Sequence, residues 1–289
     1  MMIYKLKPIF LEKIWGGQKL KSTYSSDLSN IGEVWGVSAH RSNSNMIQHS
    51  NKTLRDLYHN ERHLFGNYPS EEFPILIKII DAKEDLSVQV HPDNTYAHTF
   101  HSLGKEECWY ILDASEDAEI LIGHQSNHKD ALIEAIQNNE TMHVLKKYPI
   151  KKGDYFYIPA GTVHAILKNT VVLEVSQSSD ITYRLYDYNR IDQKGQTRDL
   201  HLKEALDVIN IPDNRVIKNH IDKFFTFKVN KNTHTSSCVA HKYGDYIGII
   251  KGHGYINEQS VKFGDFYMIA SRDHYEIKGE LEYVKVTLI

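Results

Sequence analysis

Short runs in which apolar and polar residues alternate recur along the chain and predict a mainly β protein. The run Leu86–His91 alternates strictly, and residues 73–80 form the longer apolar run that is typical of a buried strand. Aromatic and β-branched residues predict further strands at 155–158 and 171–175. This pattern favours β-structure over helix for most of the chain.

Helical signals appear in three places. Thr53 is the expected N-cap of a short helix that runs to Tyr58. Residues 126–147 carry apolar side chains at helical spacing and predict a short helical segment that interrupts the sheet. A third helix is expected at 200–209.

The second half of the chain reads as a separate, smaller β unit. Residues 211–214 are the best candidate for a linker, and short strands with glycine turns follow, for example at 246–250 and 263–269. We therefore expect one domain at 1–210 and a second at 211–289. The segment 153–160 resembles 264–271, which predicts two related β-sandwich or jelly-roll units.

Composition narrows the class of protein. The chain has 289 residues and a net charge of −3, which argues against nucleic acid as the main partner but not against a small anionic substrate. Its two cysteines form neither a disulfide framework nor a CxxC metal motif. No apolar stretch is long enough to span a bilayer, and the first residues lack the features of a signal peptide. We expect a cytoplasmic protein.

Residues 153–164 carry a pattern with a chemical meaning. They read Gly-Asp-Tyr-Phe-Tyr-Ile-Pro-Ala-Gly-Thr-Val-His and fit G-x5-P-x-G-x2-H, the second motif of the cupin β-barrels. A turn, a strand and a second turn place His164 at the head of the next strand, where its imidazole can face the barrel interior. No such PxGxxH follows the related segment 264–271, so we expect no metal in the second unit.

Other potential metal ligands lie upstream. Gln89 and His91 are two residues apart on a predicted strand, so their side chains share one face. Glu106 and Glu107 follow on another predicted strand and point to opposite faces. Alternation alone does not decide which of these glutamates points inward.

These segments together resemble a known family. Leu86–Asp93, Gly104–Ile111 and Pro159–Ile166 are, in order and spacing, similar to the type I phosphomannose isomerases, and most similar to their short bacterial form. The resemblance implies a cupin-type jelly-roll catalytic domain with a smaller, degenerate cupin-like domain. It also implies one Zn²⁺ ion per chain, a choice that suits the donor types. Its ligands would be Gln89, His91, Glu107 and His164.

The same resemblance implies an activity and further site residues. The activity is the interconversion of mannose 6-phosphate and fructose 6-phosphate through an enediol or enediolate, so the expected partner is a sugar phosphate. Arg184, Lys105 and Glu174 are the implied catalytic residues, and Lys78 and Ser87 would bind substrate. Which of them is the base stays open.

Two other functions fit the cupin motif. An iron-dependent dioxygenase would usually use three histidines and a glutamate, with HxH in the first motif and the glutamate close behind. Here the first position is Gln89, and the carboxylate lies well beyond His91. A non-catalytic sugar-binding cupin is the second alternative, against which the presence of all four ligand types together with Lys105 and Arg184 argues.

Overall fold

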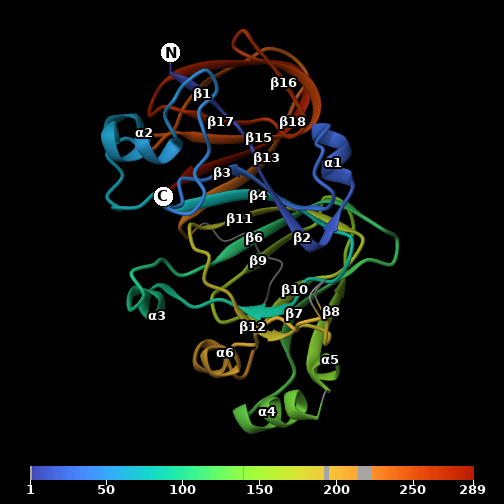
Figure 1. Cartoon of the computed structure of the whole chain (residues 1–289). Coiled ribbons are helices and arrows are strands. Elements are labelled where there is room, and N and C mark those ends of the chain that lie inside the picture. Colours follow the sequence, from blue (N-terminus) through green and yellow to red (C-terminus); the bar gives the residue numbers. More distant parts are fainter. Residues whose placement is uncertain (1, 139, 192–194, 214–222) are drawn as a thin grey trace.

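The protein is described by a computed structural model that covers residues 2–138, 140–191, 195–213 and 223–289. Three antiparallel sheets are stacked along the long axis of the molecule (Figure 1). The middle sheet has the order β2 (Ile9–Gly17), β3 (Ile31–Val37), β4 (Ile75–Ala82), β11 (Thr170–Gln177), β6 (Glu107–Ala114), β9 (Tyr155–Ile158). Below it in Figure 1 lies the sheet β12 (Tyr183–Tyr186), β5 (Val88–Val90), β10 (His164–Ile166), β7 (Glu119–His124), β8 (Leu145–Pro149).

The third sheet contains the C-terminal strands. Its main path is β1 (Ile3–Leu6), β17 (Phe266–Ile269), β15 (Asp245–Ile256), β18 (His274–Leu288), β13 (Phe225–Asn232). Strand β14 (Ser236–Val239) pairs with β18, and β16 (Gln259–Lys262) pairs with β15. The predicted mainly β fold is confirmed.

Strand alternation divides the middle sheet between two hydrophobic cores. On β4, Ile77 and Ile79 belong to a core shared with the C-terminal sheet, which also contains Tyr246 and Val284. Their neighbour Ile80 belongs to a second core, shared with the lower sheet. Successive side chains of a strand point to opposite faces, so Lys78 faces the lower sheet as Ile80 does. The face of the middle sheet that packs on the lower sheet therefore carries buried charged residues.

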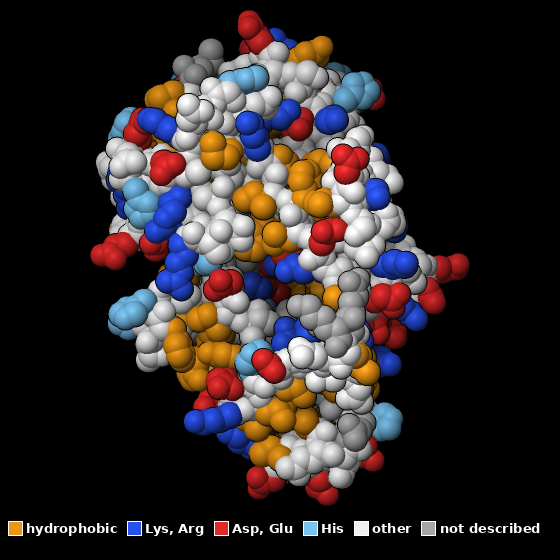
Figure 2. Space-filling model, in the orientation of Figure 1, with side chains coloured by type: hydrophobic (Ala, Val, Ile, Leu, Met, Phe, Trp, Pro, Cys, Tyr) orange, Lys and Arg blue, Asp and Glu red, His pale blue; other side chains and the backbone are white. Residues whose placement is uncertain are grey.

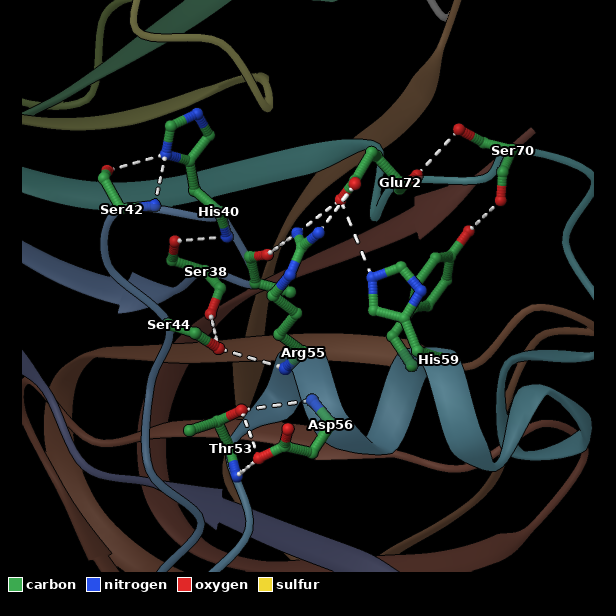
Figure 3. Close-up of polar contacts among 12 residues, drawn as sticks. Ser38, His40, Ser42, Ser44, Thr53, Arg55, Asp56, His59, Ser70 and Glu72 are labelled. Carbon is green, nitrogen blue, oxygen red and sulfur yellow. Dashed lines mark hydrogen bonds and ion pairs between the residues drawn. The ribbon is translucent and has the colours of Figure 1, made fainter.

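The helices lie at the periphery. They are α1 (Lys19–Tyr24), α2 (Leu54–Asn60), the 3₁₀ helix η1 (Arg62–Phe65), α3 (Asn94–His98), α4 (Lys129–Gln137), α5 (Thr141–Val144) and α6 (Leu202–Val208). Thr53 caps α2 as predicted: its side chain and that of Asp56 satisfy each other's backbone N–H groups, and Arg55 on the same helix pairs with Glu72 (Figure 3).

The predicted helical segment and the third helix are present. Helices α4 and α5 form the lower tip of the molecule in Figure 1, although residues 145–147 already belong to strand β8. Helix α6 occupies most of the range expected at 200–209. None of the helices in the described part of the chain is both long and apolar enough to cross a bilayer.

One strand lies in a sheet that the sequence did not predict for it. Strand β1 pairs with β17, so the first residues of the chain belong to the sheet of the last ones. The division at residue 210 stays a prediction, and the end of the proposed linker, residue 214, lies outside the described residues. Nothing in the hydrophobic pattern of 3–6 distinguishes a strand of one sheet from a strand of the other.

Candidate functional site

Two rows of side chains face each other between the middle and lower sheets. In the middle sheet, register places Trp35, Lys78, Glu174 and Trp109 side by side across β3, β4, β11 and β6. In the lower sheet, Arg184, Gln89 and His164 are neighbours across β12, β5 and β10. Residues far apart in sequence therefore meet because cross-strand neighbours on one face lie within reach of one another.

His91, Glu107 and His164 form a buried cluster at one end of these rows. Their candidate ligand atoms all lie within 4.8 Å of one another. His91 Nε2 is 3.6 Å from Glu107 Oε2, and His164 Nε2 is 3.4 Å from Glu107 Oε1. All three residues are at most 1% exposed. Glu107, rather than Glu106, is therefore the glutamate that points toward the histidines.

Both histidines are oriented as metal ligands usually are. Nδ1 of His91 lies 2.8 Å from the carbonyl oxygen of Ile181, and Nδ1 of His164 lies 2.9 Å from that of Thr162. A carbonyl accepts only, so each Nδ1 carries the proton and each Nε2 presents a lone pair to the cluster. Burial lowers the pKa of both side chains, most for His91, and keeps them neutral.

Glu107 has one carboxylate oxygen without a partner. Its Oε1 is buried and accepts no hydrogen bond from the described residues. Burial pulls the pKa of Glu107 upward, but the positive charge of Lys105 and its hydrogen bond lower the pKa overall, so the group is ionised. A buried anion facing two imidazole lone pairs fits a divalent cation.

Gln89 and Lys105 border the same cluster. The side-chain amide of Gln89 lies 3.4 Å from His164 Nε2. Lys105 Nζ lies 2.6 Å from Glu107 Oε2 and 3.0 Å from His91 Nε2. The ammonium group thus contacts ligand atoms that a cation would also use.

The side chain of Glu106, directly before β6, points to the opposite face of the middle sheet from Glu107. Its carboxylate accepts hydrogen bonds from Tyr157 and from Lys223, the latter at 2.5 Å. The two adjacent glutamates therefore have separate tasks, one at the cluster and one toward the C-terminal sheet.

A cavity of about 370 Å³ lies beside the cluster. Six predicted site residues line it: Lys78, Ser87, Gln89, Lys105, Glu174 and Arg184. The remaining three, His91, Glu107 and His164, lie buried behind it, in contact with Lys105 and Gln89. Figure 2 shows the molecule hollowed at mid-height, where the middle and lower sheets meet, with basic and acidic side chains at the margin.

Ion pairs connect the cavity to the cluster. Glu174 Oε1 is 3.1 Å from Lys78 Nζ and 3.5 Å from Lys105 Nζ. Burial opposes the charge of Lys78, but Glu174, Glu33 and Glu107 raise the pKa of Lys78, so this side chain stays an ammonium ion. Lys78 is therefore a poor candidate for a base.

Arg184 presents part of its guanidinium to the cavity. One terminal nitrogen donates to the carbonyl of Asp199 at 2.7 Å, while Nε has no hydrogen-bond partner among the described residues. Ser87 is 4% exposed and lines the same wall.

Sequence reasoning missed several lining residues. All three tryptophans of the chain, Trp15, Trp35 and Trp109, line the cavity, as do Lys13, Glu33 and Arg198. A signal for one of them exists: Glu33 is the only charged residue within Ile31–Val37, a run in which every side chain is buried. A lone carboxylate inside a buried strand marks either an interior ion pair or a site.

Comparisons with known proteins agree with this geometry. The family model "Phosphomannose isomerase type I, catalytic domain" matches residues 3–146. A probable mannose-6-phosphate isomerase of Bacillus subtilis, GmuF, is 41% identical over 85% of this chain and 78% of its own length. A second, ManA of the same organism, is 46% identical over 71% of this chain and 67% of its own. The crystal structure of a mannose 6-phosphate isomerase from B. subtilis superposes on the whole of both chains with a TM-score of 0.93 at 32% identity.

Proposed function

Because the chain belongs to the type I phosphomannose isomerase family and is therefore a mannose-6-phosphate isomerase, we propose that it works with one zinc ion held by Gln89, His91, Glu107 and His164. The observation that carries this proposal is the convergence of two neutral imidazoles on the buried carboxylate of Glu107, one oxygen of which accepts no hydrogen bond from the described residues. Nitrogen and oxygen donors of this kind suit Zn²⁺ and leave room for substrate or water. Zinc bound there would polarise the substrate oxygens at C1 and C2.

Arg184 and Ser87 are proposed to hold the phosphate. Arg184 lines the cavity, and its guanidinium is permanently charged, which suits a phosphate group. Ser87, directly before strand β5, adds a hydroxyl donor to the cavity lining. Lys78, kept cationic by its acidic neighbours, supplements the positive charge on the opposite wall.

Glu174 is the proposed carrier of the carbon-bound proton. Glu174 lines the cavity, its Oε1 accepts no hydrogen bond from the described residues, and Lys105 lies between it and Glu107. It would remove the proton from C2 of the aldose to give an enediolate and return it to C1. Lys105 would donate a proton to O1 and accept the proton from O2, which completes the interconversion.

Family membership disfavours the two alternatives. GmuF and ManA of B. subtilis, which share most of this chain, are named as isomerases, and so is a relative from Streptococcus mutans. The cluster also contains only two histidines among its described candidate ligands.

Turnover of mannose 6-phosphate before and after chelation tests the zinc proposal. We expect loss of activity on chelation and recovery on addition of one equivalent of Zn²⁺ per chain. Activity that survives full removal of metal would overturn the proposal.

Replacement of Glu174 tests the assignment of the base. Glu174→Gln should lower kcat by about 100- to 10,000-fold, the usual contribution of a general base, with zinc content unchanged. It should also abolish exchange of the C2 proton with solvent deuterium. Glu106→Gln is the matched control, because that buried carboxylate faces the other side, and it should keep both exchange and turnover. Exchange at the wild-type rate in Glu174→Gln would contradict the assignment.

A further inference from the structure

Glu33 lines the cavity at the end away from the cluster of His91, Glu107 and His164. It is separated from Glu107 by a series of alternating charges: Glu33, Lys78, Glu174, Lys105 and Glu107. It is buried and it lines the cavity. No part of the proposed reaction at C1 and C2 uses this side chain.

One oxygen of the Glu33 carboxylate accepts a hydrogen bond, and the other accepts none from the described residues. The indole N–H of Trp35 donates to Oε2 at 2.8 Å. Oε1 is 3.7 Å from Lys13 Nζ and 3.9 Å from Lys78 Nζ, both beyond hydrogen-bond distance. Among the described residues, no hydrogen bond to Oε1 is formed.

Its surroundings keep this group charged. Burial pulls the pKa of Glu33 upward, but Lys78, Lys13 and the Trp35 hydrogen bond lower it overall. A buried carboxylate with a free oxygen is a strong acceptor for a hydroxyl group, because a hydrogen bond to an ionised acceptor is stronger than one between neutral groups. Trp15 and Trp35, on the same wall, add the flat apolar surface typical of sugar-binding sites.

We propose that Glu33 is a specificity-determining residue whose free oxygen accepts a hydrogen bond from a hydroxyl on C3 or C4 of the sugar, carbons that do not change in the reaction. This inference rests on the proposed function, because it assumes that the sugar phosphate occupies this cavity with C1 and C2 toward Glu107. Trp35 is then a positioning residue that fixes the carboxylate. The enzyme recognises the sugar hydroxyls at one end of the cavity and isomerises the sugar at the other.

A purely electrostatic role makes a different prediction. If Glu33 only balanced the charge of Lys78, its replacement would affect every sugar phosphate to the same extent. If it binds one hydroxyl, the effect disappears for a substrate that lacks that hydroxyl. Deoxy sugars therefore separate the two roles.

The test compares wild type and Glu33→Ala on mannose 6-phosphate and on its 3-deoxy and 4-deoxy analogues. For mannose 6-phosphate, Glu33→Ala should lower kcat/KM by roughly 10- to 100-fold, the range for one hydrogen bond to a charged group, mainly through KM. For one of the two deoxy sugars, wild type and variant should agree within about threefold. Equal losses on all three substrates would overturn the proposal.

Two more variants keep the test decisive if Glu33→Ala folds poorly. Trp35→Phe retains the carboxylate but removes its N–H partner, so it should show the same substrate-dependent loss in weaker form. Glu12→Gln removes a carboxylate on the adjacent strand β2 that does not line the cavity and accepts from Ser29, so this variant should match wild type on every sugar. A Trp35→Phe loss that is the same for all three sugars would count against the proposal.

Zinc content and wild-type turnover separate this inference from the proposed function. Suppose that wild type turns over with one zinc per chain, and that Glu33→Ala lowers kcat/KM equally on all three sugars. This result would refute the role of Glu33 and leave the zinc proposal standing. Wild type that works without metal would refute the proposed zinc chemistry, and the deoxy-sugar comparison would still decide on Glu33.

Discussion

The turn before β9 and the turn before β17 share their backbone conformation and their Gly-Asp pair. Gly153 and Gly264 both adopt positive φ, 91° and 83°. Asp154 and Asp265 each accept from the backbone N–H three residues earlier, at 2.9 and 3.0 Å. The strands that follow pair with β6 and β15 in equivalent register. The faint repeat in the sequence thus corresponds to a repeat in hydrogen bonding.

The residues of the cluster at Glu107 and His164 have counterparts of another kind in the C-terminal sheet. Asp245 pairs with Ile269 as Glu107 pairs with Ile158, and Tyr275 follows Gly264 at the same spacing at which His164 follows Gly153. The Tyr275 hydroxyl donates to Asp245 Oδ2 at 2.7 Å, and Lys285 Nζ lies 3.7 Å from that oxygen. Here the buried carboxylate already has a donor.

The donors around the buried carboxylate decide whether the site can accept a metal ion. In the C-terminal sheet, a phenol and an ammonium satisfy the acid internally, as buried polar groups require. Around Glu107, Lys105 donates to Oε2 only, and the neutral imidazoles present lone pairs, which leaves Oε1 without a hydrogen bond among the described residues. The two sheets therefore share the strand register at the carboxylate, and the side chains around it determine whether a cation fits.

The largest expected effect comes from paired replacements at the equivalent positions His164 and Tyr275. His164→Ala should lose zinc and lower kcat/KM by at least about 1,000-fold, since it removes a ligand at the reaction centre. Tyr275→Phe should keep zinc and activity and instead lower the free energy of unfolding by about 1–3 kcal/mol, because Asp245 loses its buried donor. Metal analysis, kinetics and urea unfolding measure the three quantities. Loss of zinc in Tyr275→Phe would break the comparison.

A smaller effect is expected from replacing the two carboxylates. Glu107→Gln should weaken zinc binding by at least about 10-fold, the smallest usual cost of losing even an outer-shell partner, whereas Asp245→Asn should leave the zinc dissociation constant unchanged. Competitive titration against a fluorescent chelator measures both. Glu106→Gln should resemble Asp245→Asn, so weakened zinc binding there with normal binding in Glu107→Gln would show that the wrong glutamate has been placed at the cluster.

The smallest effect concerns the two turn glycines. Alanine at positive φ costs about 1 kcal/mol through backbone strain, so Gly153→Ala should lower the free energy of unfolding by that amount. Gly264→Ala should cost more, because its Cβ would overlap the Tyr24 side chain, whereas the nearest atom to a Cβ at Gly153 is 3.9 Å away. Denaturant titrations compare the two. Equal costs would indicate that Tyr24 moves aside freely.

The sequence predicted the site residues whose positions depend on neighbours close by in the chain. Gln89 and His91 share a face because strand side chains alternate, and the turn of residues 159–161 brings His164 to the next strand. Alternation could not choose between Glu106 and Glu107, because that choice depends on which sheet packs on which face. The structure resolves it through the core that Cys108 and Tyr157 share with the C-terminal sheet, which leaves Glu107 toward the histidines.

Long-range pairing explains what the sequence did not predict. Glu33 and Trp35 reach the cavity because β3 pairs with β4, a contact that spans a loop and a helix. Strand β1 joins the C-terminal sheet across nearly the whole chain. Local periodicity carries no information about such partners.

X-ray absorption spectroscopy of the zinc-loaded protein tests the central claim most directly. We predict one zinc per chain with only nitrogen and oxygen ligands, including two imidazoles at about 2.0–2.1 Å. The His91→Ala/His164→Ala double variant should bind no zinc at this stoichiometry. A sulfur ligand in the wild type, or an unchanged spectrum in the double variant, would contradict the account.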